Sequence, residues 1–328
     1  MDAQDFMPGP ETLARIRKEI ETYEVGRVAA ARSVRWRIPV FLGLYLVAIA
    51  AVAYVFNTFA DPREQWFSAP HVFLYVIGFA ASFFVYSAAV KPATELQQSF
   101  RDKVLPTIFG FIGDMQYARN RAPASFDRLP RAVTGSFNRQ SFDDVIAGRY
   151  DEFSFELYET TLARKAGKST QTLFRGIILA FEMETAFPGV LIATRRSGSV
   201  SRFFRDLFGG DNLDELQSGV AHLDEQYEFH SDNADAARPL VTGRLARALD
   251  WLREGFPHEP ARVALQGHDG FLLLPHNKNF FELPGVGTPL DYDQHIKPII
   301  VDMVSLLATG ALVRKVGSSD DAPERAPQ

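Results

Sequence analysis

Histidines and aspartates lie close together in the last third of the sequence, and their side chains are the ones best suited to chemistry. Imidazole and carboxylate groups bind metal ions and exchange protons near neutral pH. None of these residues has the spacing of a metal-binding motif. One His-Asp pair also falls on a predicted hairpin tip, which is a poor place for a dry catalytic pocket. We therefore predict no metal site and no catalytic residue among His268, His276, His295, Asp269, Asp291 and Asp293.

Motifs for other kinds of catalysis are missing from the sequence. The chain has no cysteine, which excludes a thiol nucleophile. It has no G-x-x-x-x-G-K-[ST] loop, no G-x-G-x-x-G after a predicted strand and no G-x-S-x-G nucleophile elbow. The formal net charge of −5 argues against nucleic acid as a partner. We predict no cofactor.

The stretch "HSDNADAARP" is the most distinctive polar segment. Ser231, Asp232, Asn233 and Arg238 are candidates for a surface that recognises a partner. The alternative is structural, because aspartate and asparagine are frequent helix N-caps and a short helix is predicted to start here after a strand ending near Phe229.

A basic cluster upstream is the second candidate surface. Arg195, Arg196, Arg202 and Arg205 alternate with phenylalanines, a combination suited to docking on anionic lipid. The alternative for this cluster is a solvated loop.

Two long stretches lack any charged side chain. No Asp, Glu, Lys or Arg occurs between Arg37 and Asp61 or between Glu64 and Lys91. Each stretch exceeds the roughly 20 residues that a helix needs to cross about 30 Å of hydrocarbon. Tryptophan and tyrosine lie toward their ends, as at lipid headgroup level. Buried helices of a soluble protein rarely lack charge over such a length, so we predict two transmembrane helices joined by a short loop.

Positive charge predicts how this hairpin is oriented. The loop carries only Arg63 against Asp61 and Glu64. Lysine and arginine favour the cytoplasmic side, so we expect both chain ends in the cytoplasm and the loop outside. The flanking positive residues are Arg15, Arg17, Lys18, Arg27, Arg32, Arg35 and Arg37 before the first stretch and Lys91, Arg101 and Lys103 after the second.

Residues 10–35 predict an amphipathic helix leading into the first span. Its apolar seam includes Ile16, Ile20 and Tyr23, and Arg27 interrupts it. Two interpretations stay open: a short coiled coil that makes a homo-oligomer, or a helix that lies on its own domain or on the lipid surface. After the second span, residues 94–117 predict a helix that continues inward from the bilayer.

The rest of the sequence predicts an α+β domain with a mainly antiparallel sheet and flanking helices, because hairpin signals replace repeated βαβ units. Residues 141–144, "SFDD", resemble a capping box and predict a short helix ending near Gly148. Strands are predicted at 151–164 and, as a pair turning at Pro188 and Gly189, at 171–196. Residues 262–276 predict a hairpin that reverses at Asp269 and Gly270. Two helices are expected, one capped by Thr242 and one starting near Thr288.

Four domains follow from these patterns. They are an amphipathic N-terminal helix (1–36), a transmembrane hairpin (37–91), a cytoplasmic α+β domain (92–317) and a disordered tail (318–328).

Several segments together resemble a known family. The two-span hairpin, "LFRGIILAFEMETAFPGVLI", "YEFHSDNADAARPLVTGRLARALDWL" and "GFLLLPHNKNFFEL" resemble bacterial two-span membrane proteins that carry a domain of unknown function (DUF3137). The resemblance covers roughly residues 90–316. It implies a bacterial inner-membrane protein with its domain in the cytosol, and it brings no catalytic residues.

We therefore expect a membrane-anchored cytoplasmic module, in contact with the lipid bilayer, that binds a protein or lipid partner. The alternative is a membrane-associated enzyme acting on a lipid or another membrane-bound substrate. A channel or transporter subunit is less favoured, because neither span holds an ionisable residue except His71 near one end.

Overall fold

A computed structural model describes residues 9–59, 69–110, 112–150, 153–196, 213–255, 260–277 and 280–315. These residues form two compact units. The helical unit comprises Gly9–Ile108 and Leu283–His295, and the sheet unit comprises Phe109–Glu282 and the residues from Ile296 onward. The predicted tail at 318–328 and most of the predicted loop between the spans lie outside the described residues.

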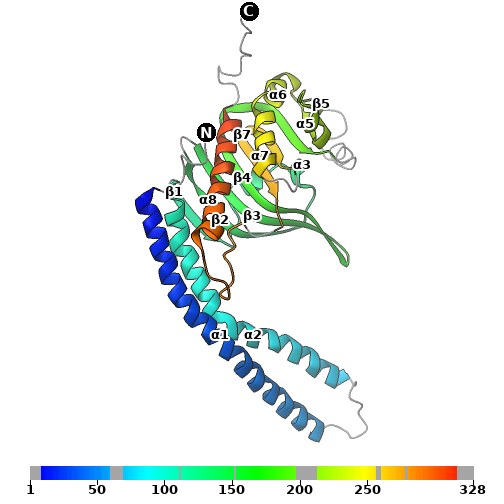
Figure 1. The fold of residues 1–328 in the computed structure, drawn as a ribbon. Coiled ribbons are helices and arrows are strands. Elements are labelled where there is room, and N and C mark those ends of the chain that lie inside the picture. Colours follow the sequence, from blue (N-terminus) through cyan, green and yellow to red (C-terminus); the bar gives the residue numbers. More distant parts are fainter. Residues whose placement is uncertain are drawn as a thin grey trace, which may run out of the picture. The chain divides into compact units, whose positions relative to one another are not determined.

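Two long antiparallel helices make up most of the helical unit (Figure 1). They are α1 (Pro10–Phe59) and α2 (Ala69–Ile108). Residues early in α1 contact residues late in α2, and residues late in α1 contact residues early in α2. The charged halves of the two helices therefore lie side by side, and so do their uncharged halves. The contacts are the rings of Tyr23 and Phe100, 4.4 Å between centroids, the hydrogen bond from the Tyr45 hydroxyl to the Gly78 carbonyl, and the rings of Phe56 and His71, 5.1 Å between centroids.

The predicted seam of residues 10–35 is buried. Ile16, Ile20 and Tyr23 are each less than a tenth exposed, and Tyr23 contacts α2. The seam therefore packs at least partly on a helix of the same chain. The second predicted helix ends at Ile108, short of its predicted end at residue 117, because residues 113–119 pair as a strand.

The segment Leu283–His295 returns to the helix pair. The Arg27 guanidinium, 11% exposed, pairs with the Glu24 carboxylate and donates to the Val286 carbonyl at 2.9 Å. Glu24 in turn accepts the Leu290 N–H at 2.7 Å. Arg27, which interrupts the apolar seam in the sequence, thus ties this later segment to α1.

Among the described residues, the sheet unit contains one antiparallel sheet of seven strands. Figure 1 shows how this sheet is arranged. The strand order is β1-β2-β3-β4-β6-β5, and β7 also pairs with β4. This confirms the predicted α+β class with a mainly antiparallel sheet. The strands are β1 (Gly113–Arg119), β2 (Arg139–Tyr150), β3 (Phe153–Ala166), β4 (Ser169–Arg195), β5 (Asp214–Leu216), β6 (Tyr227–Ser231) and β7 (Arg262–Pro275).

Two predicted hairpins are wrong, because long-range pairing overrides local turn signals. β4 is one strand of 27 residues that pairs with β3 along its first half and with β6 along its second. β7 runs through Asp269 and Gly270 without reversing, because it pairs with β4 on both sides of that point. The register between β4 and β7 shifts on both sides of Phe187 of β4. Gly267 of β7 pairs with Phe187 and has a positive φ of 55°.

Helices cover both faces of the sheet. On one face, Gly310 of α8 lets that helix approach Leu179 and Phe181 of β4. On the other, Phe126 and Val133 pack with Tyr158, Ile178 and their neighbours in the core. The helices are α3 (Arg131–Thr134), α5 (Ala221–Gln226), α6 (Ala234–Val241), α7 (Arg244–Gly255) and α8 (Lys297–Arg314), with a 3-10 turn at Phe126–Arg128 and a π-helical turn at Tyr292–Ile296.

The two predicted helices of this domain are present, with one correction. Leu245, Leu249 and Leu252 of α7 are buried, as the apolar spacing predicts. Thr242 does not cap α7; it ends α6, and its hydroxyl donates to the Arg238 carbonyl at 2.9 Å.

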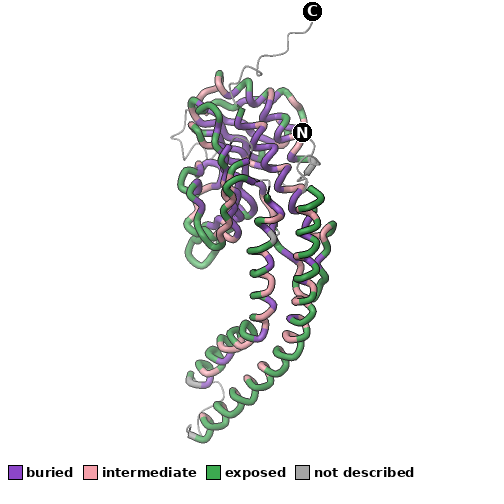
Figure 2. The backbone as a smooth tube through the Cα atoms, turned by 90° about the vertical axis from the view of Figure 1, so that its left-hand side faces the viewer, coloured by how far each residue is buried: buried purple, intermediate pink, exposed green. Residues whose placement is uncertain are grey.

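By length and composition, three helices among the described residues are apolar enough to cross a membrane, although the sequence predicted two. In the third, Tyr292–Arg314, 67% of the most apolar window is buried inside the protein, whereas the share is 0% in α1 and 11% in α2. A helix that is apolar on all sides and covered by protein is a core helix. Figure 2 shows the contrast, with α1 and α2 largely green.

Candidate functional site

A bulge in β2 gathers three carboxylates at one point of the sheet. Phe142 pairs with Thr160 and Val145 with Tyr158, so two residues of β2, Asp143 and Asp144, face the single residue Glu159 of β3. Candidate ligand oxygens of the three acids all lie within 4.8 Å of one another. Here they are called the acid trio. "SFDD" was predicted as a helix start; that prediction is wrong, because the pairing of β2 with β1 and β3 keeps it extended.

Each member of the acid trio has partners in neighbouring elements. Arg119 at the end of β1 lies 3.1 Å from the Asp143 carboxylate and 3.4 Å from that of Asp144. Asp144 is fully buried and accepts the Tyr117 hydroxyl. Two of the three carboxylates, Asp143 and Asp144, thus share the Arg119 guanidinium.

Glu159 is the least solvated of the pocket-lining acids. It is 7% exposed, and its Oε1 accepts the N–H groups of Phe280 and Phe281, the latter at 3.2 Å. Burial, followed by the charge of Asp144, raises the pKa of Glu159 to about 7, although the two N–H groups oppose the shift. A carboxyl group with this pKa exchanges its proton near neutral pH.

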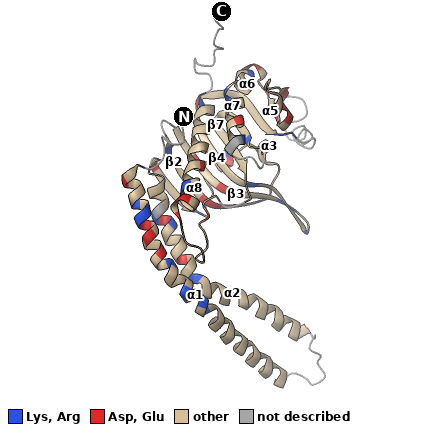
Figure 3. Ribbon diagram, in the orientation of Figure 1, with Lys and Arg blue, Asp and Glu red and all other residues tan. Residues whose placement is uncertain are grey.

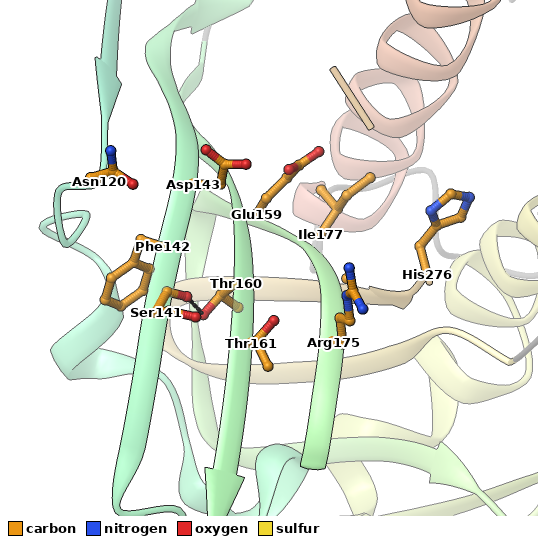
Figure 4. Close-up of a pocket in the computed structure, with 11 residues that line it drawn as sticks. Asn120, Ser141, Phe142, Asp143, Glu159, Thr160, Thr161, Arg175, Ile177 and His276 are labelled. Carbon is orange, nitrogen blue, oxygen red and sulfur yellow. Dashed lines mark hydrogen bonds between the residues drawn. The ribbon is translucent and has the colours of Figure 1, made fainter. Parts of the chain in front are cut away.

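Two members of the trio line a cavity of about 320 Å³ (Figure 4). Asp143 and Glu159 line one part of it, and Arg175 and His276 another. Gly176 follows Arg175 in β4 and pairs with Pro275, the residue before His276. An added Cβ on Gly176 would lie 2.0 Å from the Leu274 carbonyl oxygen, so only glycine fits. The remaining lining comes from Asn120, Ser141, Phe142, Thr160, Thr161 and Ile177.

The chemistry open to this pocket is polar. Carboxylate oxygens at this spacing suit a hard cation such as Mg²⁺ or Ca²⁺. Such an ion would compete with Arg119 for Asp143 and with two N–H groups for Glu159. Glu159 and His276 also supply groups that can donate or accept a proton, and Arg175 supplies an anion-binding group.

A second cavity of about 310 Å³ lies elsewhere in the sheet unit. It is lined by Ser125, Glu156 and His268 among others. The Glu156 carboxylate accepts the N–H of Ser125 at 2.6 Å, and Arg128 pairs with Asp269 at 3.0 Å. Glu156, Arg128 and Asp269 are thus already engaged by groups of the same cavity wall.

The histidines singled out in the sequence do not converge. His276 lines the first cavity directly after the end of β7, and His268 lines the second from the middle of that strand. His295 belongs to the helical unit, where its Nδ1 lies 2.9 Å from the Asp291 backbone nitrogen.

The polar residues at the end of β6 and just after it make hydrogen bonds within the fold. Ser231 is fully buried and donates to the Val190 carbonyl at 2.8 Å, while the Asp232 carboxylate accepts the Val190 N–H at 2.7 Å. Asn233 is the N-cap of α6 and accepts the Ala236 N–H at 3.2 Å. Arg238 is exposed on α6.

Only half of the predicted basic cluster is described. Arg195 and Arg196 are exposed at the end of β4, and Arg196 lies 3.1 Å from Glu215. Arg202 and Arg205 lie outside the described residues.

Comparison with known proteins identifies one segment of the chain. Residues 172–312 match the model of the family described as "Protein of unknown function (DUF3137)". This confirms the resemblance stated from the sequence for that segment. No curated protein matches the chain. A crystal structure of the mycobacterial trehalose monomycolate transport factor A, TtfA, is similar at 11% identity, with a TM-score of 0.32, and the match covers 60% of this chain and 88% of that one.

The matched segment contains only part of the pocket. Arg175 and His276 lie inside it, whereas Asp143, Asp144 and Glu159 lie before it. Sequence reasoning missed all three acids. The available signal was "FDDVIAGRY" followed directly by an alternating strand, which together read as a hairpin with two acids in its first arm.

Proposed function

We propose that this protein is a membrane-anchored binding module. Two spans hold the α+β domain at the cytoplasmic face of a bacterial inner membrane, and the domain binds a protein or lipid partner. The observation that carries the proposal is the exposed apolar surface of α1 and α2.

The large hydrophobic side chains exposed in the described residues all lie on α1 and α2. Leu44 is 66% exposed and Phe79 is 82% exposed. An uncovered apolar surface of this extent is unfavourable in water and favourable in lipid. Figure 3 supports the same assignment, because the distal halves of both helices carry neither blue nor red residues.

The dimensions of this surface fit a bilayer. The 22 residues from 38 to 59 of α1 make roughly 33 Å of helix at 1.5 Å per residue. Exposed aromatic residues mark both ends: Trp36 and Tyr86 at one, Tyr54 and Tyr75 at the other. Trp36 and Tyr54 are separated by roughly 27 Å along the helix, near the thickness of the hydrocarbon core.

Charge asymmetry supports the orientation. Lysine and arginine are concentrated before the apolar part of α1 and after the apolar part of α2. Arg63 is the one positive residue in the sequence that connects the two apolar parts. Positive residues remain on the cytoplasmic side.

Single cysteines test the anchor and its orientation directly, because the natural chain has none. Asn57→Cys and Thr22→Cys both introduce the thiol at an exposed position of α1. A maleimide that cannot cross the inner membrane should label Asn57→Cys in intact cells and Thr22→Cys only after the membrane is opened. Labelling of both in intact cells, or of Thr22→Cys alone, contradicts the topology.

A photo-crosslinker at the pocket tests partner binding. Asn120 borders the cavity and is exposed, whereas Lys168 is exposed at the β3–β4 turn and serves as the control. Repeated capture of the same partner through position 120 but not through position 168 supports a binding module whose pocket contributes to partner binding. Equal capture at both positions contradicts a role for the pocket.

A second candidate function, an enzyme acting on a lipid or another membrane-bound substrate, is favoured by one observation. Glu159 has a pKa of about 7 and lines a cavity that also contains His276. Glu159→Gln keeps the shape and removes the proton-exchanging group. Loss of lipid turnover in membranes containing this variant supports the enzyme; unchanged lipid turnover together with unchanged partner capture supports the binding module.

A further inference from the structure

We propose that Arg32, Arg35 and Arg37 of α1 form a binding site for the phosphate groups of anionic phospholipids. These three residues are called the arginine collar. The inference rests on the proposed membrane anchor and goes beyond it, since an anchor needs only apolar surface and has no preference among lipid headgroups.

The arginine collar is exposed and uncompensated. All three side chains are exposed, and none has an ion pair or hydrogen bond within the described residues. Along α1, no aspartate or glutamate occurs between Glu24 and Asp61. The collar therefore presents positive charge that no group on its own helix neutralises.

The collar sits at the boundary of the apolar surface. The uncharged stretch starts directly after Arg37, and Trp36, which is 69% exposed, lies within the collar. Tryptophan favours the headgroup level of a bilayer. With Ile38 onward in hydrocarbon, the guanidinium groups lie at the depth of the lipid phosphates.

The neighbouring helix adds a positive charge at this level. Gly26 packs against Leu96 and Tyr45 against Gly78, and this antiparallel register brings Lys91 to the level of Arg32. Lys91 lies 3.6 Å from Glu95, and both side chains are mostly exposed, at 70% and 63%. Glu95 thus compensates Lys91 but leaves the three arginines of α1 without a partner.

Guanidinium chemistry identifies the ligand. Arginine binds phosphate through two parallel N–H bonds and holds its charge at any physiological pH. Three such groups within roughly 7.5 Å of helix length favour a headgroup with net negative charge over a zwitterionic one, whose own cation would be repelled. Each basic residue near an anionic surface strengthens binding about fivefold, so the collar as a whole contributes a preference on the order of 100-fold.

Lipid retention by the full-length protein tests the inference. The protein is inserted into nanodiscs of equal parts phosphatidylglycerol and phosphatidylcholine, and native mass spectrometry counts the lipids that stay bound after release. The wild type should retain phosphatidylglycerol in large excess. Arg32→Gln, Arg35→Gln and Arg37→Gln combined should bring the ratio of the two lipids close to one.

A charge-matched control removes three cations elsewhere on the same helices. Arg15, Lys18 and Lys103 are exposed and lie at least 12 residues, about 18 Å, from the collar level. That separation is roughly twice the Debye length at physiological salt. Their glutamine variant should retain phosphatidylglycerol like the wild type. Arg32→Lys, Arg35→Lys and Arg37→Lys combined keep the charge without the bidentate geometry and should give an intermediate ratio.

The outcomes separate the collar from the anchor. No lipid preference in the wild type, or the same preference in the collar variant, overturns the inference while the anchor stands. Equal loss in the collar variant and the charge-matched control also overturns it, because net charge would then be the cause. Failure of the wild type to enter nanodiscs at all refutes the anchor itself.

Discussion

Replacing Glu159 with glutamine should remove a large part of the pH dependence of stability between pH 5 and pH 8. The side chain is 7% exposed, and its pKa rises from 4.5 to about 7 because of burial and the nearby Asp144 charge. The folded state therefore binds the proton more tightly than the unfolded chain does. The stabilisation is complete below pH 4.5 and is lost as pH rises through 7.

The magnitude follows from the two pKa values. With 4.5 for the unfolded chain and about 7 for the folded protein, the free energy of unfolding falls by roughly 2–3 kcal/mol from pH 5 to pH 8 through this group alone. Glutamine keeps an oxygen that can accept the Phe280 and Phe281 N–H groups but carries no titrating proton. Glu159→Gln should therefore be more stable than the wild type at pH 8 and show a flatter profile.

Urea unfolding of the full chain in detergent, followed by far-UV circular dichroism, measures this profile. The buffer contains a chelator, because a cation on the acid trio would hold Glu159 ionised. Glu156→Gln is the matched substitution for comparison, because Glu156 lies on the same strand and also accepts backbone N–H groups. Parallel pH profiles for the wild type and Glu159→Gln would refute the assignment of a near-neutral pKa.

Three further substitutions give defined outcomes. Gly176→Ala places a Cβ against the Leu274 carbonyl and should lower the free energy of unfolding by about 3 kcal/mol or more. Gly167→Ala, with open space around it, should lower it by about 1 kcal/mol. Thermal unfolding compares the two variants, and equal losses of stability would contradict the packing around Gly176. Arg27→Gln breaks the tie to Val286 and should make residues 283–295 more sensitive to limited proteolysis, with an unchanged cleavage pattern as the contrary result. Asn233→Ala removes the cap of α6 and should cost roughly 1 kcal/mol in urea unfolding; no loss would mean that the cap is dispensable.

The architecture could be predicted wherever the signal is long and periodic. The uncharged stretches predicted α1 and α2, and the apolar spacing of Leu245, Leu249 and Leu252 predicted the buried face of α7. Asn233 as a helix cap also followed from residue type and position, and the structure confirms it. These features depend on neighbours within a few turns of the same helix.

The acid trio could not be predicted in this way, because it depends on pairing between strands. Asp143 and Asp144 meet Glu159 only through an irregularity of register between β2 and β3, and local sequence does not specify register. The same limit explains β7, where the Asp269-Gly270 turn signal is overridden by pairing with β4. His276 was noticed as a residue type, but its neighbours in the pocket come from three other strands.

The most direct test of the membrane anchor is a depth measurement on spin labels attached to single cysteines. Leu44 on α1 and Phe79 on α2 lie at matching levels of the antiparallel pair, and Val25 lies in the charged half; all three are at least 66% exposed. In reconstituted bilayers, labels at positions 44 and 79 should collide far more often with oxygen than with a polar nickel complex, and the two labels should report the same depth. A label at position 25 should collide more often with the nickel complex than with oxygen. Equal access of the nickel complex to all three positions would contradict a membrane-spanning helix pair.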